Sequence, residues 1–389
     1  MKFDVVIIGG GIVGSSLALA LKDSGLNIAL VESRPPSTFP DDKSWDSRIY
    51  AISPGSVSFL EDLEVWTAIN RNRITPVHEM EIFGDDDSAR LDFSAYDAGM
   101  TELAFIVENR QLQTAAWNKL EKQRTKIKVF CPMQCTSIEW NETHVDVRLS
   151  NGKLLQTALI IGADGVNSWV RNQAKIEVSQ YPYQQGAMVA NFSTELSHQN
   201  IARQWFRRDG VLALLPLPGK LISMVWSANE EQSTRLLSLS ETDICQQVEE
   251  ASGHTLGKLQ LITKPVSFPL NFVHVKNLIE PRLALIGDAA HGIHPLAGQG
   301  VNLGLRDARK LVSTIIERGP RSDCGDYMLL RQYERARKED ILAMEFATDS
   351  LQKLFNNENP TLARLRNLGL GITNQFPLLK NRLMQHALN

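Results

Sequence analysis

The first part of the chain alternates between apolar runs and short breaks that contain glycine. Residues 3–8 and 28–31 are apolar and rich in β-branched side chains, which is typical of buried parallel strands. Between them, residues 15–21 combine apolar and small side chains, as in a helix packed closely on a sheet. The order strand, helix, strand predicts a βαβ unit with a parallel sheet.

Later segments predict further elements of both kinds. A helix is expected near residues 53–70, and residues 109–123 have helical periodicity. Residues 143–149 and 153–161, separated by Asn151-Gly152, predict a hairpin.

The middle of the chain predicts a mostly antiparallel β region. Its expected strands and turns are residues 187–195, 203–207, 211–217 and 220–227, with turns at Asp209-Gly210 and Pro218-Gly219. Residues 241–252 then predict a helix, residues 282–286 a buried parallel strand, and the chain from residue 304 onward is helical in pattern.

Three glycines follow the first strand in the spacing Gly-x-Gly-x-x-Gly, as Gly9, Gly11 and Gly14. In a dinucleotide fingerprint the first allows a tight turn, the second lets the backbone approach a pyrophosphate, and the third lets the helix approach the strand. The N–H groups and dipole of the helix start favour phosphate. Glu32, 18 residues after Gly14, stands where an acid would take ribose hydroxyls. The complete order of elements indicates a dinucleotide site rather than a chance turn.

A second motif, residues 162–171, follows the second strand of the predicted hairpin and reads Gly-Ala-Asp-Gly-Val-Asn-Ser-Trp-Val-Arg. Asp164 could cap backbone N–H groups and anchor a turn that faces the phosphates. A plain turn after a strand is the alternative, and this motif alone does not decide between them.

The third motif, residues 287–307, begins with Asp288 at the end of a predicted strand. The Asp288 carboxylate could bond a sugar or ribityl hydroxyl, or it could be only a helix cap. Pro295 fixes a turn, and a glycine-rich helix start follows with Gly298, Gln299, Gly300, Val301 and Asn302. Backbone N–H groups there would stabilise negative charge at the N1–C2=O edge of a reduced flavin. For His291 and His294 we expect structural hydrogen bonds rather than a role as base.

The fingerprint and the third motif lie far apart in the chain, so one chain holds both ends of a long cofactor, which points to FAD. We expect an α/β fold in which a Rossmann-like FAD-binding domain is interleaved with a mostly antiparallel β-sheet substrate domain, followed by C-terminal helices. The expected boundaries are 1–70, 100–180 and 275–350 for the FAD-binding domain, 71–99 and 181–274 for the β domain, and 351–389 for a helical tail.

Composition agrees with an enzyme of this kind. A chain of 389 residues accommodates two domains, and 43% hydrophobic and 22% charged residues are ordinary for a globular protein. The net charge of −3 gives no basic field for nucleic acid. The N-terminus, with Asp4, enters a strand at once and is not a signal peptide, and no apolar run approaches a membrane span. We therefore expect a cytoplasmic protein.

We expect no metal site. The four cysteines, Cys131, Cys135, Cys245 and Cys324, show no Cys-x-x-Cys pairing and are expected to be reduced thiols. The acidic run at residues 85–87 is typical of a solvated turn, because no spaced ligands follow it.

These motifs together resemble a known family. The fingerprint with Glu32, Asp164-Gly165 and residues 287–291 resembles the class A flavoprotein aromatic hydroxylases, which share the para-hydroxybenzoate hydroxylase fold. Residues 294–304 are similar to the signature of the ubiquinone-biosynthesis hydroxylases. Further matching segments, over nearly the whole chain, are Arg48 with residues 51–53, residues 107–110, residues 214–217 and residues 225–226.

The resemblance implies a role for each matching residue. Gly9, Gly11, Gly14 and Glu32 would lie at the ADP half of FAD, with Arg48 and Arg110 near the phosphates or the ribityl chain. Asp164 and Asp288 would hold the turns and the sugar chain. Residues 295–302 would edge the isoalloxazine, with Pro295, Gly298 and Gln299 in the flavin-edge loop next to the reaction and no side-chain base assigned.

The implied activity is FAD-dependent hydroxylation of an aromatic ring. Reduced flavin and O2 would give a C4a-hydroperoxide, whose distal oxygen attacks an electron-rich phenol. NAD(P)H or another reductant would supply the electrons. The implied substrate is a polyprenylated phenol or benzoquinol intermediate of ubiquinone biosynthesis. Residues 211–227 are apolar enough to line a channel for its tail, although ordinary sheet core is the alternative for most of them.

Three other functions remain open. The chain could hydroxylate a small soluble phenol, or it could be a non-catalytic FAD-bound scaffold of a quinone-biosynthesis complex. A Rossmann-type NAD dehydrogenase is the third, and residues 287–307 argue against it.

The C-terminal segment, residues 350–389, carries five basic side chains against one acid, Glu358, interleaved with leucines. A basic, apolar and helical tail is typical of a surface that meets an anionic membrane or a partner helix. We therefore expect a peripheral contact with the inner face of the membrane or with a quinone-biosynthesis complex. The alternative is that the leucines cover the core of the FAD-binding domain.

Overall fold

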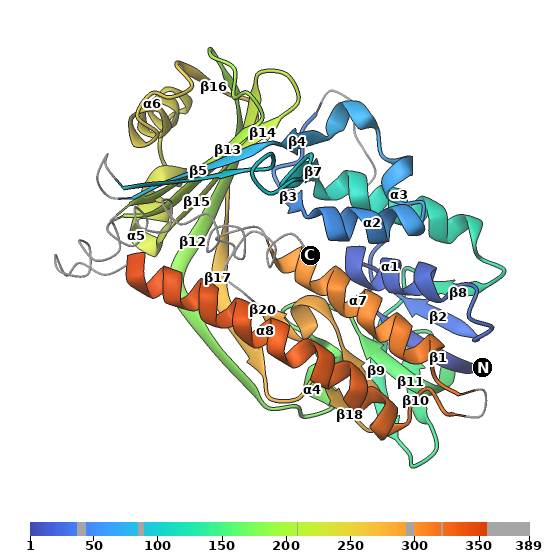
Figure 1. Cartoon of the computed structure of the whole chain (residues 1–389). Coiled ribbons are helices and arrows are strands. Elements are labelled where there is room, and N and C mark those ends of the chain that lie inside the picture. Colours follow the sequence, from blue (N-terminus) through green and yellow to red (C-terminus); the bar gives the residue numbers. More distant parts are fainter. Residues whose placement is uncertain (37–43, 85–88, 208, 293–298, 320–321, 356–389) are drawn as a thin grey trace.

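The computed structural model describes residues 1–36, 44–84, 89–207, 209–292, 299–319 and 322–355. Within these residues the strands form three sheets. Two large sheets stand at opposite sides of the molecule, and a long C-terminal helix runs along both (Figure 1).

The first sheet has the parallel centre that the N-terminal pattern predicts. Among the described strands its order is β18–β19–β11–β1–β2–β8, and the antiparallel strands β10 and β9 continue it from β11. β1 pairs in parallel with both β11 and β2 because each is a buried apolar run. The bounds are β1 (Lys2–Ile8), β2 (Ile28–Val31), β8 (Ile127–Phe130), β9 (Cys135–Trp140), β10 (Val145–Leu149), β11 (Leu154–Gly162), β18 (Ile279–Glu280) and β19 (Leu283–Leu285).

Helices cover this sheet and connect its strands. α1 (Ile12–Leu21) packs against α3 (Asn109–Lys122) and α7 (Gly300–Ile316), and α7 packs against α8 (Tyr327–Phe355). α1 is short of polar residues because nearly all of it is buried. The other helices here are α2 (Pro54–Asp62), α4 (Trp169–Gln173) and the 3₁₀ turns η1 (Trp66–Ala68), η2 (Arg71–Arg73) and η3 (Gly287–Ala289).

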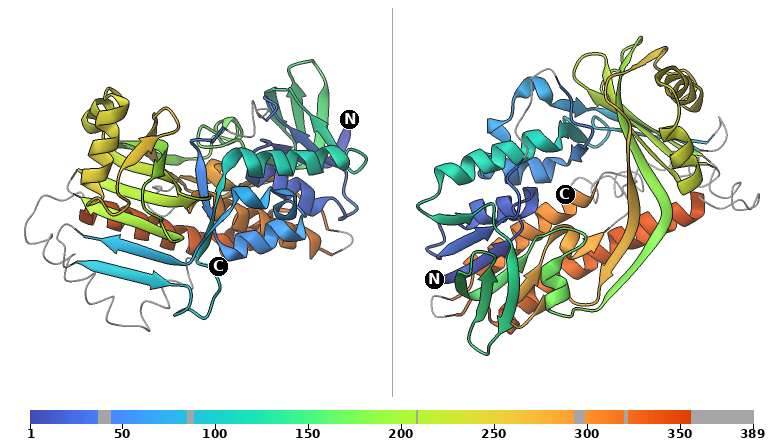
Figure 2. Two further views of the ribbon diagram at one scale, coloured as in Figure 1. Left: turned by 90° about the horizontal axis from the view of Figure 1, so that it is seen from above. Right: turned by 180° about the vertical axis from the view of Figure 1, so that it is seen from behind.

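The second large sheet is mostly antiparallel, with described strands in the order β20–β17–β12–β15–β14–β13–β5–β6 and β16 on β12. β12 and β17 are long and run side by side toward the first sheet (Figure 2). The bounds are β5 (Glu79–Phe83), β6 (Arg90–Ser94), β12 (Val178–Thr194), β13 (Ile201–Arg207), β14 (Gly210–Leu217), β15 (Leu221–Asn229), β16 (Leu259–Leu261), β17 (Val266–Val275) and β20 (His291–Gly292).

One face of the second sheet is closed by two helices, α5 (Glu230–Leu237) and α6 (Glu241–Ala251). Their buried residues Leu236, Ile244 and Val248 pack with Leu214 and Trp226 of the sheet. The opposite face looks toward the first sheet. A small third sheet, β3 (Ile49–Ile52), β7 (Ala104–Glu108) and β4 (Thr75–Val77), lies between the two large ones.

The structure differs from the sequence pattern in several places. The helical pattern after residue 304 is interrupted, because α7 ends at Ile316 and α8 begins at Tyr327. Gly319 and the proline after it in the sequence explain the interruption, since both disfavour a helix interior. The sequence analysis also missed α5, the β5–β6 hairpin and the long strand β17. The helix expected near residues 53–70 ends at Asp62. The domain boundaries expected from the sequence remain a prediction.

Candidate functional site

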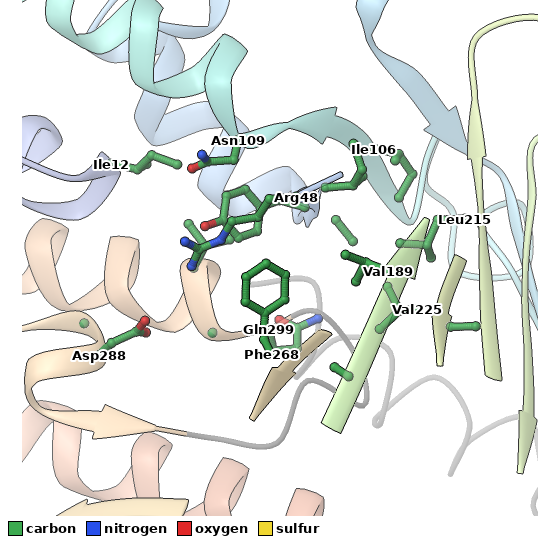
Figure 3. Close-up of a pocket in the computed structure, with 18 of the residues that line it drawn as sticks. Ile12, Arg48, Ile106, Asn109, Val189, Leu215, Val225, Phe268, Asp288 and Gln299 are labelled. Carbon is green, nitrogen blue, oxygen red and sulfur yellow. The ribbon is translucent and has the colours of Figure 1, made fainter. Parts of the chain in front are cut away.

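A cavity of about 840 Å³ lies where the three sheets meet. Its wall includes the glycine turn after β1, the turn after β11, the start of α7, and the open face of the second sheet. Figure 3 shows Ile12, Asn109 and Asp288 on one side of the cavity and Leu215 and Val225 on the other. Segments far apart in the chain, from Gly11 to Val301, therefore build one site.

The glycine turn has the geometry that the fingerprint predicts. Gly9 has φ +108°, and a Cβ built on it would stand 2.3 Å from the Ala163 oxygen. A Cβ on Gly14 would stand 2.1 Å from the Gly9 oxygen. A Cβ on Gly11 would instead meet nothing within 4 Å, and Gly11 lines the cavity. Gly9 and Gly14 are thus required by packing, whereas Gly11 leaves open space beside the start of α1, where a pyrophosphate would approach.

Glu32 directly follows β2 and lies beside this turn. Its Oε2 accepts a hydrogen bond from Gly10 N at 2.6 Å, and its Oε1 accepts one from Arg34 N at 2.9 Å. These bonds fix the carboxylate next to the glycine turn. Its contact with ribose hydroxyls remains a prediction.

Asp164 anchors the turn after β11. Its carboxylate accepts hydrogen bonds from Ser168 Oγ at 2.5 Å and from Val170 N at 3.1 Å, so it caps the start of α4. The neighbouring residues Ala163, Gly165, Val166 and Asn167 line the cavity, but Asp164 does not. Asp164 therefore shapes the cavity wall from behind.

The third motif brings an acid and a helix start to the same wall. Asp288, in η3, is exposed to the cavity, and its carboxylate accepts no hydrogen bond from any residue that the structure describes. Gln299, Gly300 and Val301 line the wall at the start of α7, a helix long enough to have a substantial dipole.

Asn302 acts from outside the cavity. Its Oδ1 accepts a hydrogen bond from Ser53 N at 3.0 Å, and its Nδ2 donates to Ala51 O at 2.9 Å. It therefore fixes the start of α7 to the end of β3.

Of the two arginines expected near FAD, Arg48 lines the cavity and Arg110 does not. Arg48 points into the cavity between Asn109 and Phe268 (Figure 3). Arg110 does not line the cavity; its Nε donates to Glu108 Oε1 at 3.0 Å and its Nη1 to Ser44 Oγ at 2.9 Å. Glu108, which is fully buried, also pairs with Arg73 at 2.6 Å. Arg110 thus stabilises the chain segment that carries Arg48, and its nearness to FAD phosphates remains a prediction.

A buried charged network, which sequence reasoning missed, supports the wall at η3. Asp307 of α7 accepts hydrogen bonds from Gly287 N at 2.9 Å, from His291 Nε2 at 2.6 Å and from Arg337 Nε at 2.7 Å. The sequence signal for this network is an acid, Asp307, on the buried face of a predicted helix. His291 makes the structural hydrogen bond expected of it.

The network shifts the pKa values of His291 and Asp307. Burial disfavours the His291 imidazolium, but the Asp307 carboxylate outweighs burial, so the pKa of His291 is raised from its ordinary 6.5. Burial alone would raise the pKa of Asp307, but His291 and then Arg337 outweigh it and lower that pKa from 3.8. Both groups are therefore charged over a common pH range.

The sheet wall of the cavity is apolar and alternates along each strand. Ala187 and Val189 of β12, Ala213 and Leu215 of β14, and Val225 of β15 face the cavity. Their neighbours in the chain belong to the core under α5 and α6: Met188, Ala190, Leu212, Leu214, Met224 and Trp226. Of residues 211–227, which were expected to line a channel, Ala213, Leu215 and Val225 line the cavity, whereas Leu212, Leu214, Ile222, Met224 and Trp226 are sheet core.

Several predicted positions lie outside the described residues. They are Pro295 and Gly298 of the flavin-edge loop, His294, the acidic run at residues 85–87 and the tail from residue 356. In the part of the chain that is described, no group of three His, Cys, Asp or Glu side chains could hold a metal ion. The four cysteines are free thiols. No described helix is long and apolar enough to cross a membrane.

The residues present fit FAD. The open approach at Gly11 lies beside a helix start, which suits a pyrophosphate, and the exposed Asp288 carboxylate suits a sugar or ribityl hydroxyl. The start of α7, with Gln299 to Val301, offers N–H donors to the edge of a flavin ring.

Comparisons with known proteins agree with this site. The FAD binding domain family matches residues 2–346. The 3-demethoxyubiquinol 3-hydroxylase of Escherichia coli (strain K12) is 34% identical over 388 residues, which cover 99% of this chain and 98% of that protein. The mitochondrial ubiquinone biosynthesis monooxygenase of Xenopus tropicalis is 32% identical over 435 residues, covering 99% and 93%.

A solved structure shares the fold. The probable FAD-dependent monooxygenase pqsL of Pseudomonas aeruginosa superposes with a TM-score of 0.79 at 21% identity, covering 95% of this chain and 99% of that one. Fold and site thus define an FAD-dependent monooxygenase of the para-hydroxybenzoate hydroxylase fold. Within that class, the chain belongs to the hydroxylase family of ubiquinone biosynthesis.

Proposed function

We propose that this protein hydroxylates the aromatic ring of a polyprenylated phenol or benzoquinol intermediate of ubiquinone biosynthesis. One oxygen atom of O2 would enter a ring C–H bond as a hydroxyl, the other would leave as water, and NAD(P)H or another reductant would supply two electrons. The observation that carries the proposal is one cavity with a glycine turn and two helix starts on one side and an apolar sheet on the other.

The cofactor side would bind and orient FAD. Gly11 leaves room for the pyrophosphate at the start of α1, and Asp288 offers an acceptor to a ribityl or ribose hydroxyl. Arg48 places a positive charge in the cavity (Figure 3). Bound FAD would supply the redox chemistry, since flavins accept hydride and pass electrons to O2. The N–H groups near Gln299, Gly300 and Val301 would stabilise negative charge at the flavin edge.

The sheet side would hold the ring and exclude water. Val189, Leu215 and Val225 offer apolar contact from three strands (Figure 3). Excluding water strengthens the electrostatic interactions inside the cavity and suppresses side reactions. One relative is named a 3-demethoxyubiquinol 3-hydroxylase and the other a ubiquinone biosynthesis monooxygenase, and this apolar wall suits an aromatic ring of that kind.

Turnover with a panel of phenols tests the proposal. The purified protein would be loaded with FAD and given NADH or NADPH, with phenols that carry either a long prenyl tail or no tail. We expect O2-dependent product that contains one atom of ¹⁸O from ¹⁸O2, and higher kcat/KM for the tailed phenol. Gly11→Val is the matched control without cofactor. A preference for the tailless phenol would favour hydroxylation of a small soluble phenol, and absence of any product would favour a scaffold.

Contact with a membrane or a complex is a separate proposal that rests on the sequence of residues 350–389 alone. Each basic residue near an anionic surface would contribute about 1 kcal/mol, and salt would weaken it. Vesicles with and without anionic lipid would be sedimented with the wild type and with a variant in which Arg364, Arg366, Lys380 and Arg382 are Gln. We expect only the wild type to sediment with anionic vesicles, and equal behaviour of the two proteins would contradict the proposal.

A further inference from the structure

One polar side chain interrupts the apolar sheet wall. Along β5, β6 and β12 to β15, every described residue that lines the cavity is apolar except Gln204 of β13. Gln204 is only 4% exposed. Its neighbours in the chain face away, since Arg203 Nε donates to Glu81 at 2.6 Å and Trp205 stacks on Phe83 at 5.2 Å between ring centroids. Strand alternation therefore directs Gln204 toward the cavity.

The amide of Gln204 makes no side-chain hydrogen bond with any residue in the described part of the chain. Its Oε1 and Nε2 are not among the fully buried atoms without a partner, so they are open to the cavity. An amide with two donors and an acceptor in an otherwise apolar wall is therefore free to bind a polar group of a ligand, and an apolar ligand that covered it would leave those hydrogen bonds unmade at a cost.

Strand register places this amide at the end of an apolar row. Gln204 pairs with Ala213, Ala213 with Val225, and Val225 with Val189. Figure 3 shows the side chains of Val225 and Val189 directed into the cavity. Ala202 and Leu215 of the neighbouring row also line the cavity, so apolar side chains surround the Gln204 amide.

We propose that Gln204 binds an oxygen substituent of the aromatic substrate and thereby sets which ring carbon faces the cofactor side. This inference rests on the proposed function and deepens it. The amide NH2 can donate to a methoxy or carbonyl oxygen, and the amide oxygen can accept from a ring hydroxyl. The apolar row holds the ring face without competing for those bonds, so the ring turns until an oxygen meets Gln204.

Other polar groups line the cavity outside β5, β6 and β12 to β15, among them Asn271 of β17. Arg48, Asn109 and Asp288 stand on the opposite side of the cavity from Val225 (Figure 3), where FAD would engage them. Gln204 is therefore a specificity-determining residue on the substrate side, separate from cofactor binding.

The test compares two probes with one variant. The probes are 2-methoxyphenol carrying a short prenyl chain and the prenylbenzene with the same chain and no ring oxygen. The variant is Gln204→Met, which keeps the side-chain length but removes the amide. Gln246→Met, at an exposed position of α6, is the matched control. FAD content, the Kd of each probe from flavin absorbance, and the position of the new hydroxyl are measured for each protein.

We expect Gln204→Met to retain FAD and to bind prenylbenzene at least as tightly as the wild type. Its affinity for the methoxyphenol should fall about tenfold, the loss of one hydrogen bond, and its product should become a mixture of ring positions. Gln246→Met should match the wild type throughout. If Gln204→Met fails to fold, Gln204→Ala replaces it, because a smaller side chain on a cavity wall causes no steric clash.

Two results would overturn the inference: equal affinity of the wild type for both probes, or unchanged discrimination and product position in the Gln204 variants. Failure of the proposed function looks different. The wild type would then bind the oxygenated probe through Gln204 and lose that preference in the variants, yet form no O2-dependent product.

Discussion

The two sides of the cavity are built in different ways. On the cofactor side, turns and helix starts at the ends of strands supply much of the wall within the described residues: 11–13, 163–167, 286–288 and 299–301. On the sheet side, single residues two positions apart on β12 to β15 supply it, and the residues between them form a separate core. The first side is defined by backbone, and the second by side chains.

This difference determines which substitutions each side can tolerate. A backbone site fails when a Cβ appears where a glycine stood, as at Gly9 and Gly14, whatever the chemistry of that side chain. A sheet wall keeps its backbone when a cavity residue changes, so the substrate can be altered without loss of the fold. We therefore expect cofactor binding to be rigidly specified and substrate choice to depend on a few exchangeable side chains.

The buried network behind the cofactor side should show the largest effect. Asp307→Ala removes the acceptor of Gly287 N, His291 and Arg337 and leaves an uncompensated buried arginine. We expect the free energy of unfolding to fall by about 3–5 kcal/mol, measured by urea denaturation. Asp92→Ala, in an exposed pair with Arg90, is the control and should cost no more than about 1 kcal/mol. Similar losses in both variants would contradict a supporting role for Asp307.

The same network predicts how stability depends on pH. The lowered pKa of Asp307 gives stability that is present above pH 3.8 and is lost as the pH falls through its folded value. The raised pKa of His291 gives stability that is complete below pH 6.5 and is lost as the pH rises through its folded value. Its contribution should therefore be greatest between pH 3.8 and 6.5. Tm against pH should lose its alkaline decline in His291→Gln, and an identical profile would contradict this.

Two adjacent leucines of β14 separate sheet core from cavity wall. Leu214 is 1% exposed and lies in the core under α5 and α6, whereas Leu215 lines the cavity. Leu214→Ala should lower the free energy of unfolding by about 2–5 kcal/mol, and Leu215→Ala should cost clearly less because cavity already adjoins its side chain. Leu215→Ala should instead raise the KM for a tailed phenol. Equal destabilisation by the two changes would show that the sheet has no such division.

Two glycines of the fingerprint have different roles: Gly14 is needed for packing, and Gly11 for the approach of the cofactor. Gly14→Val forces a Cβ against the Gly9 oxygen and should cost about 3 kcal/mol of folding stability. Gly11 has φ −65° and open space around its Cβ, so Gly11→Val should fold normally yet purify without the yellow of FAD. Thermal denaturation of the apoproteins and flavin absorbance measure the two effects. Full FAD occupancy in Gly11→Val would contradict the proposed position of the pyrophosphate.

The same contrast explains what could be predicted from the sequence. The parallel strands, the glycine turn and the start of α7 were predictable because each depends on residues close together in the chain. Leu215 and Leu214 could not be told apart, because which face of β14 meets the cavity depends on the helices packed on the other face. Gln204 escaped notice for the same reason.

Long-range pairing was the other limit. The resemblance places Arg110 near the phosphates or the ribityl chain, and that remains a prediction. Its guanidinium donates to Ser44 Oγ, a partner distant in the chain that no pattern in the sequence gives. Asp307 and Arg337 are likewise joined only by the packing of α7 on α8.

The smallest effect that we expect tests a side chain on the backbone-defined side. Asp288 is exposed to the cavity and makes no hydrogen bond within the described chain, so Asp288→Ala should leave the fold intact. Losing one charge-assisted bond to a sugar hydroxyl should weaken FAD binding by about 1.5–3 kcal/mol and abolish hydroxylation. Asp164→Ala is the matched control, since Asp164 caps α4 without lining the cavity. Its loss should lower Tm and leave FAD affinity nearly unchanged. Isothermal titration of the apoproteins with FAD measures the affinities, and thermal denaturation measures Tm. Wild-type affinity and turnover in Asp288→Ala would mean that the cofactor side is held by backbone alone.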